Sequence, residues 1–85
     1  MALVRDGVRV NVVLPGTIFE PGGDLDRMRQ QEPDRVEALE ASIPSGRFGT
    51  PEEVANCIAF LLSEQSRWVV GHCLVADGGQ FPGIA

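Results

Sequence analysis

The stretch GVRVNVVLPGTI at residues 7–18 decides the fold. Valine and leucine alternate with other residues over residues 8–14, and the run becomes more apolar toward its carboxyl end before it stops at Pro15-Gly16. Alternation with a period of two is typical of a β-strand. A strand that is apolar on both faces is typical of a parallel sheet covered on both sides. The stretch therefore predicts a parallel strand over residues 8–14 that ends in a sharp turn.

The residues ahead of this strand resemble the last turn of a helix. In LVRDG, residues 3–7, Gly7 stands where a helix commonly ends with a left-handed residue. Residues 1–7 are therefore predicted to be a helix tail, and that helix is expected to begin before Met1.

Residues 15–49 form a long, mostly polar excursion. Within it, residues 24–31 and 33–42 are each predicted to be a short helix, because Pro33 cannot continue the first helix but can open the second. Each helix carries one narrow apolar stripe, Leu25/Met28 and Val36/Leu39. Excursions of this length in compact domains are usually lids or binding loops.

Residues 50–63, TPEEVANCIAFLLS, give the clearest helical pattern. Thr50 is a good N-cap, Pro51 suits the first helical position, and Glu53 completes a capping box with Thr50. A second strand is predicted over residues 72–76 and a turn at Asp77-Gly-Gly. Residues 77–85 are predicted to be the tail of the chain, and within it only a partner would order QFPGIA, residues 80–85.

Strand, helix and strand with a right-handed crossover give two neighbouring parallel strands. Such a pair needs helices on both faces, and the chain offers one substantial helix. The predicted fold class is α/β, as a partial Rossmann-like layer with one apolar sheet face and the strand edges uncovered. Self-association is expected from that uncovered face.

Composition excludes several classes of partner. The 85 residues include seven arginines, no lysine and twelve acidic residues, for a net charge of −5, and they hold no basic cluster. That pattern argues against nucleic acid and anionic membranes as partners. No stretch is long enough to cross a bilayer, charge comes too early for a signal peptide, and two cysteines with one histidine fit no metal or disulfide framework. Two buried, reduced thiols in a cytoplasmic protein are expected.

Three motifs in this order and spacing, at residues 7–18, 46–63 and 69–79, resemble the C-terminal third of the short-chain dehydrogenase/reductase family. The resemblance runs from about Leu3 to Gly79. It implies a doubly wound Rossmann sheet, of which this chain holds the last two strands and the helix between them. It also implies NAD or NADP as cofactor, lying across the carboxyl ends of the strands.

The same resemblance implies the cofactor-binding residues Pro15, Gly16, Thr17 and Ile18. Pro15 and Gly16 would shape the wall beside the nicotinamide, and the backbone of Ile18 would hydrogen-bond its carboxamide. The family commonly has Thr where this chain has Glu20. A carboxylate accepts hydrogen bonds and repels a pyrophosphate, so a loop path that turns Glu20 to solvent is the simplest expectation.

Residues 22–46 resemble the family's substrate lid. Their apolar stripes either line an apolar substrate or, as we favour, pack the lid on its own protein. The family's glycine-rich turn, its Ser and its Tyr-x-x-x-Lys helix are absent, and the chain has no Tyr and no Lys. No catalytic residue is therefore assigned. The resemblance implies an inactive C-terminal fragment of an NAD(P)-dependent oxidoreductase that acts on a small alcohol or carbonyl substrate. The alternative is a non-catalytic partner-binding or oligomerisation module.

The remaining polar and aromatic residues are assigned structural roles. His72 is expected to be exposed or structural, Glu52 and Glu53 to serve helix electrostatics rather than a metal, and Asp77 to shape its turn. Arg47 could meet a phosphate, but the resemblance favours an arginine that anchors the lid. Trp68 and Phe81 are either core residues or contacts of a homo-oligomer, which in this family commonly forms through the last helix and strand.

Overall fold

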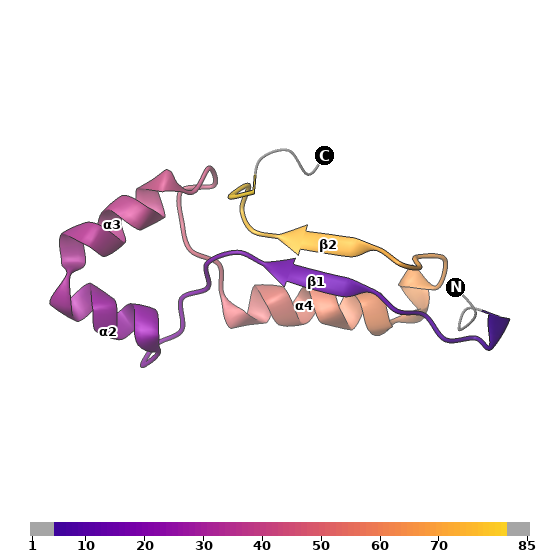
Figure 1. Cartoon of the computed structure of the whole chain (residues 1–85). Helices are drawn as coiled ribbons and strands as arrows, with labels where there is room; N and C mark the ends of the chain where they lie inside the picture. The colour runs from indigo at the N-terminus through magenta and orange to yellow at the C-terminus, as the bar shows by residue number, and fades with distance from the viewer. Residues whose placement is uncertain (1–4, 82–85) are drawn as a thin grey trace.

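A computed structural model gives the structure of the chain and describes residues 5–81 (Figure 1). Strands β1 (Val12–Pro15) and β2 (Cys73–Ala76) pair in parallel, with Val12 opposite Cys73. Between them lie the helices α2 (Asp24–Gln31), α3 (Pro33–Ser42) and α4 (Pro51–Leu62) and the short 3-10 helix η1 (Glu64–Ser66). Helix α4 lies along the strand pair, while α2 and α3 form a hairpin beyond its carboxyl end (Figure 1). The predicted α/β class with two neighbouring parallel strands is confirmed.

The strands are shorter than the predicted ranges of 8–14 and 72–76. A β-ladder needs an extended partner strand, and the segment opposite residues 8–11 turns at Gly71, whose φ is 66°. One backbone hydrogen bond remains there, from the Gly71 N–H to the Val10 carbonyl at 3.0 Å. Beside it the Asn11 side chain makes the other contacts: its Nδ2 donates to the Val69 carbonyl at 3.0 Å, and its Oδ1 accepts from the His72 N–H at 2.8 Å. Residues 8–11 therefore stay outside the ladder. Ahead of them, Gly7 has the left-handed φ of 79° expected at a helix end, and residues 1–4 of the predicted tail lie outside the described part.

Both ends of α4 are fixed by side chains. At its start, Thr50 Oγ1 accepts from the Glu53 N–H at 3.2 Å and Glu53 Oε1 accepts from the Thr50 N–H at 3.0 Å, which confirms the predicted capping box. Beyond its other end, the Arg9 guanidinium donates to the carbonyls of Ser66 and Val69 at 3.1 and 3.2 Å. A cation near the carboxyl end of a helix stabilises it electrostatically.

The α2–α3 hairpin has a small core of its own. Val36, Ile43 and Phe48 are buried, and Phe19, Leu25 and Met28 pack against them. The rings of Phe19 and Phe48 stack with centroids 6.3 Å apart, and the Arg29 guanidinium lies 4.2 Å from the centroid of Phe19. The predicted stripes therefore pack on their own protein, except that Leu39 remains 37% exposed.

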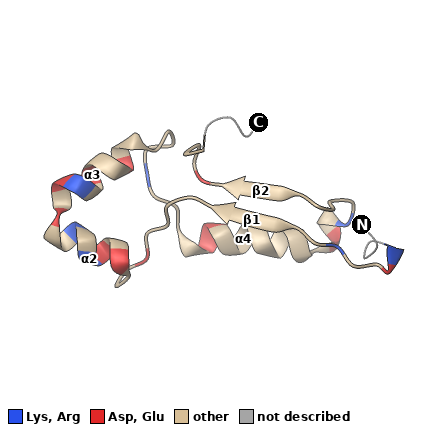
Figure 2. Cartoon of the chain, viewed as in Figure 1, with Lys and Arg blue, Asp and Glu red and all other residues tan. Residues whose placement is uncertain are grey.

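One face of the strand pair is uncovered, as the incomplete layer predicts. Val12 is 56% exposed, and Val10 and Leu14 on the same side are exposed as well. Charged residues of both signs gather on α2 and α3, whereas the strands are almost uncharged (Figure 2). The radius of gyration of 16.1 Å exceeds the about 12 Å expected for a compact chain of this length. A large apolar patch of this kind is typical of a surface that other protein covers.

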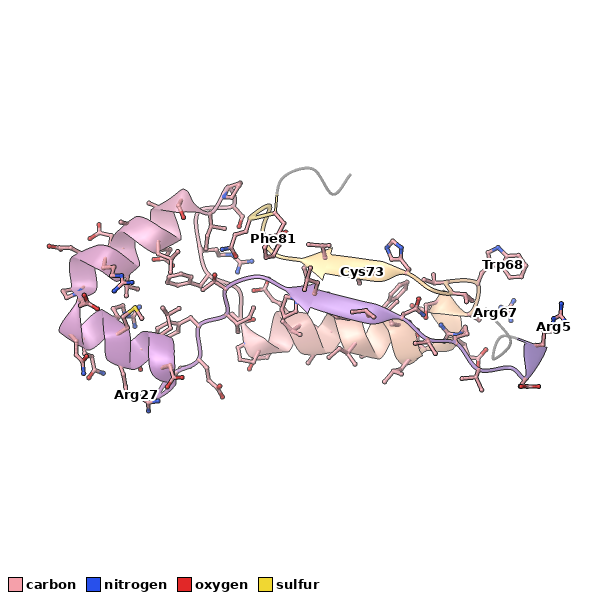
Figure 3. All side chains as sticks on the ribbon, viewed as in Figure 1. Arg5, Arg27, Arg67, Trp68, Cys73 and Phe81 are labelled. Atoms are coloured by element: carbon pink, nitrogen blue, oxygen red, sulfur yellow. The ribbon has the colours of Figure 1, made fainter. Side chains whose placement is uncertain are left out.

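The prediction of two buried thiols is wrong, and one of the two alternatives for Trp68 is removed. Cys73 is exposed on the uncovered face and Cys57 is half-buried, so the two free thiols are not core residues. Trp68 projects from the end of the molecule far from the hairpin and is 96% exposed, so it is no core residue of this chain (Figure 3). Among the described helices, none has the length and apolar character needed to cross a membrane.

Candidate functional site

The carboxyl ends of β1 and β2 meet at one end of the strand pair. The Gly16 N–H donates to the Ala76 carbonyl at 3.0 Å, so the turns at residues 16–18 and 77–79 lie against each other. A cavity of about 580 Å³ opens between these two turns, the first half of α4 and residues 45–49 at the end of the hairpin. We call it the strand-end cavity. Open α/β sheets generally bind ligands at this end.

Pro15 and Gly16 occupy the end of the strand as predicted. Pro15 is the last residue of β1, pairs with Ala76 and has an exposed side chain. Gly16 has no room for a side chain, because a Cβ there would lie 2.8 Å from Asp77 Cα and would also overlap Gln80. Close approach of the two turns therefore requires glycine at this position.

At Ile18, both the backbone N–H and the backbone C=O are unengaged. Its neighbours are both bound to Gly49: the Thr17 carbonyl accepts from Gly49 N–H at 3.0 Å, and the Phe19 N–H donates to the Gly49 carbonyl at 2.9 Å. Alternate residues of an extended segment point their polar groups to opposite sides. The N–H and C=O of Ile18 therefore point away from Gly49, and no hydrogen bond within residues 5–81 engages either. This residue thus offers one donor and one acceptor on the same side.

Thr17 is held by a residue that the sequence pattern missed. Its N–H donates to Gln80 Oε1 at 2.7 Å, and its hydroxyl accepts from Gln80 Nε2 at 2.9 Å. The prediction that residues 80–85 are ordered only by a partner is therefore wrong for Gln80, which is half-buried here. Residues 82–85 lie outside the described part. A polar side chain next to a Gly-Gly turn was the one available signal, and it did not indicate a contact 63 residues away.

Asp77 shapes the turn that carries Gln80. Its two carboxylate oxygens accept from the N–H groups of Gly79 at 2.9 Å and Phe81 at 2.8 Å. The predicted turn role of this residue is confirmed. Gly78, with a φ of 61°, brings the same turn against the hairpin, where its carbonyl accepts from the Ser45 N–H at 3.0 Å.

Arg47 joins the hairpin to α4. Its guanidinium donates to both oxygens of Glu53, each at 2.7 Å, and to the Phe48 carbonyl at 2.9 Å. The hydrogen bond from Arg47, with a further one from the Thr50 N–H, lowers the pKa of Glu53 to about 2. The same pair raises the pKa of Arg47. These contacts are those of an arginine that anchors the hairpin.

We expect a pH titration of the Glu53 carboxyl to distinguish the Arg47–Glu53 pair from ordinary surface charges. Because the folded state lowers this pKa from 4.5, the pair stabilises the fold above pH 4.5 and loses that effect as the pH falls toward 2. Carboxyl carbon shifts measured by NMR should give a midpoint near 2, and Arg47→Ala should raise it toward 4.5. A midpoint that does not change in Arg47→Ala would disprove the role assigned to Arg47.

His72 and Glu20, also singled out in the sequence, do not line the strand-end cavity. His72 is exposed, as expected. Glu20 is exposed too, so its side chain takes the path to solvent that the sequence suggested. No group of His, Cys, Asp and Glu side chains within residues 5–81 is arranged to hold a metal ion.

Comparison with known proteins places the chain among oxidoreductases. The family model described as enoyl-(acyl carrier protein) reductase matches residues 1–80. The chain is 43% identical to 2-(S)-hydroxypropyl-CoM dehydrogenase 3 of Xanthobacter autotrophicus over 74 residues. This match covers 86% of this chain and 29% of that protein. It is 38% identical over 81 residues to L-rhamnose 1-dehydrogenase (NAD(P)(+)) of a Sphingomonas species, covering 95% of this chain and 31% of that protein.

A solved structure agrees with these sequence matches. A short-chain dehydrogenase/reductase family oxidoreductase from Burkholderia thailandensis superimposes with a TM-score of 0.78 at 42% identity, covering 91% of this chain and 30% of that one. The chain thus spans less than a third of the length of these relatives. The residues that the family model matches include both strands, α4 and the two turns of the strand-end cavity. From its sequence and its fold, the chain belongs to the short-chain dehydrogenase/reductase family.

Proposed function

We propose that residues 1–85 are the carboxyl-terminal segment of an NAD(P)-dependent oxidoreductase. The enzyme transfers hydride between the nicotinamide and an alcohol or carbonyl substrate. Support comes from the relatives, which are about three times longer, and from one of them, which is named for NAD(P)(+). Two free thiols in the described residues suit the reducing conditions of the cytoplasm, where we place the protein.

The observation that carries the proposal is that the backbone N–H and C=O of Ile18 are both free and lie on the same side. A nicotinamide carboxamide has one carbonyl acceptor and one NH₂ donor, which match the unengaged N–H and C=O of this residue. Pro15, Gly16 and Thr17 complete the wall around it at the carboxyl end of β1. When bound, the cofactor supplies the hydride chemistry, and this segment binds and orients the ring. The residues for the proton transfer belong to the rest of the enzyme, since this segment has no Tyr and no Lys.

We assign residues 22–46 to a substrate lid. The α2–α3 hairpin has its own core and is joined to the rest of the chain by the Ile18–Gly49 bridge, the Ser45–Gly78 hydrogen bond and the Arg47–Glu53 ion pair. A segment with that construction moves as one body about a few connections, which is what closure over a substrate requires. The uncovered face of β1 is proposed to pack against the remainder of the enzyme, and the last helix and strand to contact a second subunit.

Ile18→Pro in the full-length protein tests directly whether the backbone N–H of residue 18 binds the cofactor. Proline removes the N–H of residue 18 and leaves its carbonyl, and the extended Thr17 before it tolerates proline. Loss of one hydrogen bond to a buried polar group is expected to raise the Kd for NAD(P)H by about tenfold or more. Isothermal titration calorimetry measures this change.

Ile18→Val is the matched control, because it keeps the N–H while shortening the side chain. It should bind NAD(P)H almost as the wild type does. The 85-residue chain alone should give no turnover, whereas turnover by that chain would show that it is a complete catalyst. Failure of the wild-type full-length protein to bind NAD(P)H would overturn the proposed function.

A further inference from the structure

We propose that Gln80 is a positioning residue for the nicotinamide site: its side-chain amide fixes Thr17, and through Thr17 the peptide of Ile18. This inference rests on the proposed function and adds to it a residue from the opposite end of the chain. The role is one of orientation, since Gln80 hydrogen-bonds Thr17 and not the N–H and C=O of Ile18 that are proposed to bind the carboxamide.

The amide of Gln80 makes two hydrogen bonds to one residue. Its Oε1 accepts from the Thr17 N–H at 2.7 Å, and its Nε2 donates to Thr17 Oγ1 at 2.9 Å. One contact reaches the backbone and the other the side chain, so together they fix both the position and the rotation of Thr17. Both residues are half-buried, where hydrogen bonds compete less with water than they do at the surface.

The constraint on Thr17 passes to Ile18 through a planar group. The Thr17 carbonyl and the Ile18 N–H belong to the same peptide plane and point to opposite sides of the chain. Gly49 holds that carbonyl at 3.0 Å, while Gln80 holds the N–H on the other side of Thr17. With both peptide units of Thr17 tied, the direction of the free Ile18 N–H is set before any ligand arrives. Preorganised donors lose less conformational entropy on binding.

The backbone around Gln80 is tied down as well. The Asp77 carboxylate accepts from the N–H groups of Gly79 and Phe81, the residues on either side, and the Gln80 N–H donates to the Asp77 carbonyl at 3.2 Å. The turn after β2 therefore aims the Gln80 side chain at the turn after β1. Gly16 provides the space for this contact, because a Cβ there would overlap Gln80 Oε1.

Gln80→Met in the full-length protein tests the inference. Methionine has nearly the same length, but its thioether cannot donate a hydrogen bond and accepts one only weakly. The variant therefore keeps the packing and loses the contacts that orient Thr17. The Kd for NAD(P)H should rise by about tenfold, the Thr17 amide should exchange its hydrogen faster, and the KM for the other substrate should change little. Gln80→Glu should restore the slow exchange of the Thr17 amide, because a carboxylate accepts from both the N–H and the hydroxyl of Thr17.

Gln65→Met is the matched control, since Gln65 is exposed in η1. It should leave both NAD(P)H binding and the exchange of Thr17 unchanged. If wild type binds NAD(P)H and Gln80→Met binds it equally well, the role of Gln80 is disproved while the proposed function stands. If wild type does not bind it, both fail. Unchanged exchange of the Thr17 amide in Gln80→Met would also contradict the inference.

Discussion

Phe48→Ala is expected to unfold the α2–α3 hairpin while the strand pair and α4 stay folded. Phe48 is 5% exposed and stacks on Phe19 in a core that is separate from the face between α4 and the strands. Truncation of a buried phenylalanine lowers the free energy of unfolding by about 3–5 kcal/mol. So small a core has little else to compensate the loss. Hydrogen exchange of the 85-residue chain should therefore show lost protection in residues 24–42 and retained protection in residues 51–62.

Phe60→Ala is the matched control for this experiment. Phe60 lies in α4 and is 44% exposed, so the same truncation should change the free energy of unfolding by about 0.5 kcal/mol or less. Equal loss of protection in α4 and in the hairpin after Phe48→Ala would show that the two parts unfold as one unit. The lid assignment would then lose its main physical support, because a lid must move without melting the rest of the protein.

The helices were predictable because their signals are local. Pro33 separates α2 from α3, and Thr50 with Glu53 marks the start of α4 within a span of four residues. Each of these patterns is complete within one or two turns of chain. The parallel pairing followed from the order of the elements, since a strand–helix–strand unit closes with one hand.

The lengths of the strands and the contacts of the site were not predictable in this way. Asn11 ends the ladder through Val69 and His72, and Gln80 holds Thr17 across 63 residues. Such contacts leave no periodicity in the sequence, because each depends on where two distant turns meet. The place of Pro15-Gly16 at a strand end followed from the apolar pattern, whereas the role proposed for Ile18 came from the family resemblance. A backbone contact makes no demand on residue type, so composition does not reveal it.

Gly16→Ala is expected to disturb the two turns of the strand-end cavity together. Gly16 does not have a positive φ, so alanine causes no backbone strain there, and the whole effect comes from contact. Its Cβ would lie 2.8 Å from Asp77 Cα and would overlap Gln80 Oε1, so the backbone of the second turn must move. Overpacking of this kind lowers the free energy of unfolding by about 1–3 kcal/mol. Displacement of Gln80 should also weaken NAD(P)H binding, by at least as much as Gln80→Met does.

Gly49→Ala, on the other side of the same site, is the control that isolates the backbone contact. Gly49 also lacks a positive φ, but the nearest atom to its Cβ is the terminal Cδ1 of Ile18, at 2.8 Å, which a rotation of that side chain can move away. Thermal unfolding and NAD(P)H affinity of the full-length variants should therefore fall clearly more in Gly16→Ala than in Gly49→Ala. Equal effects would mean that the turn at residues 77–79 yields as easily as a side chain does. In that case, the tight approach of the two turns would not be what holds Thr17 and Ile18 in place.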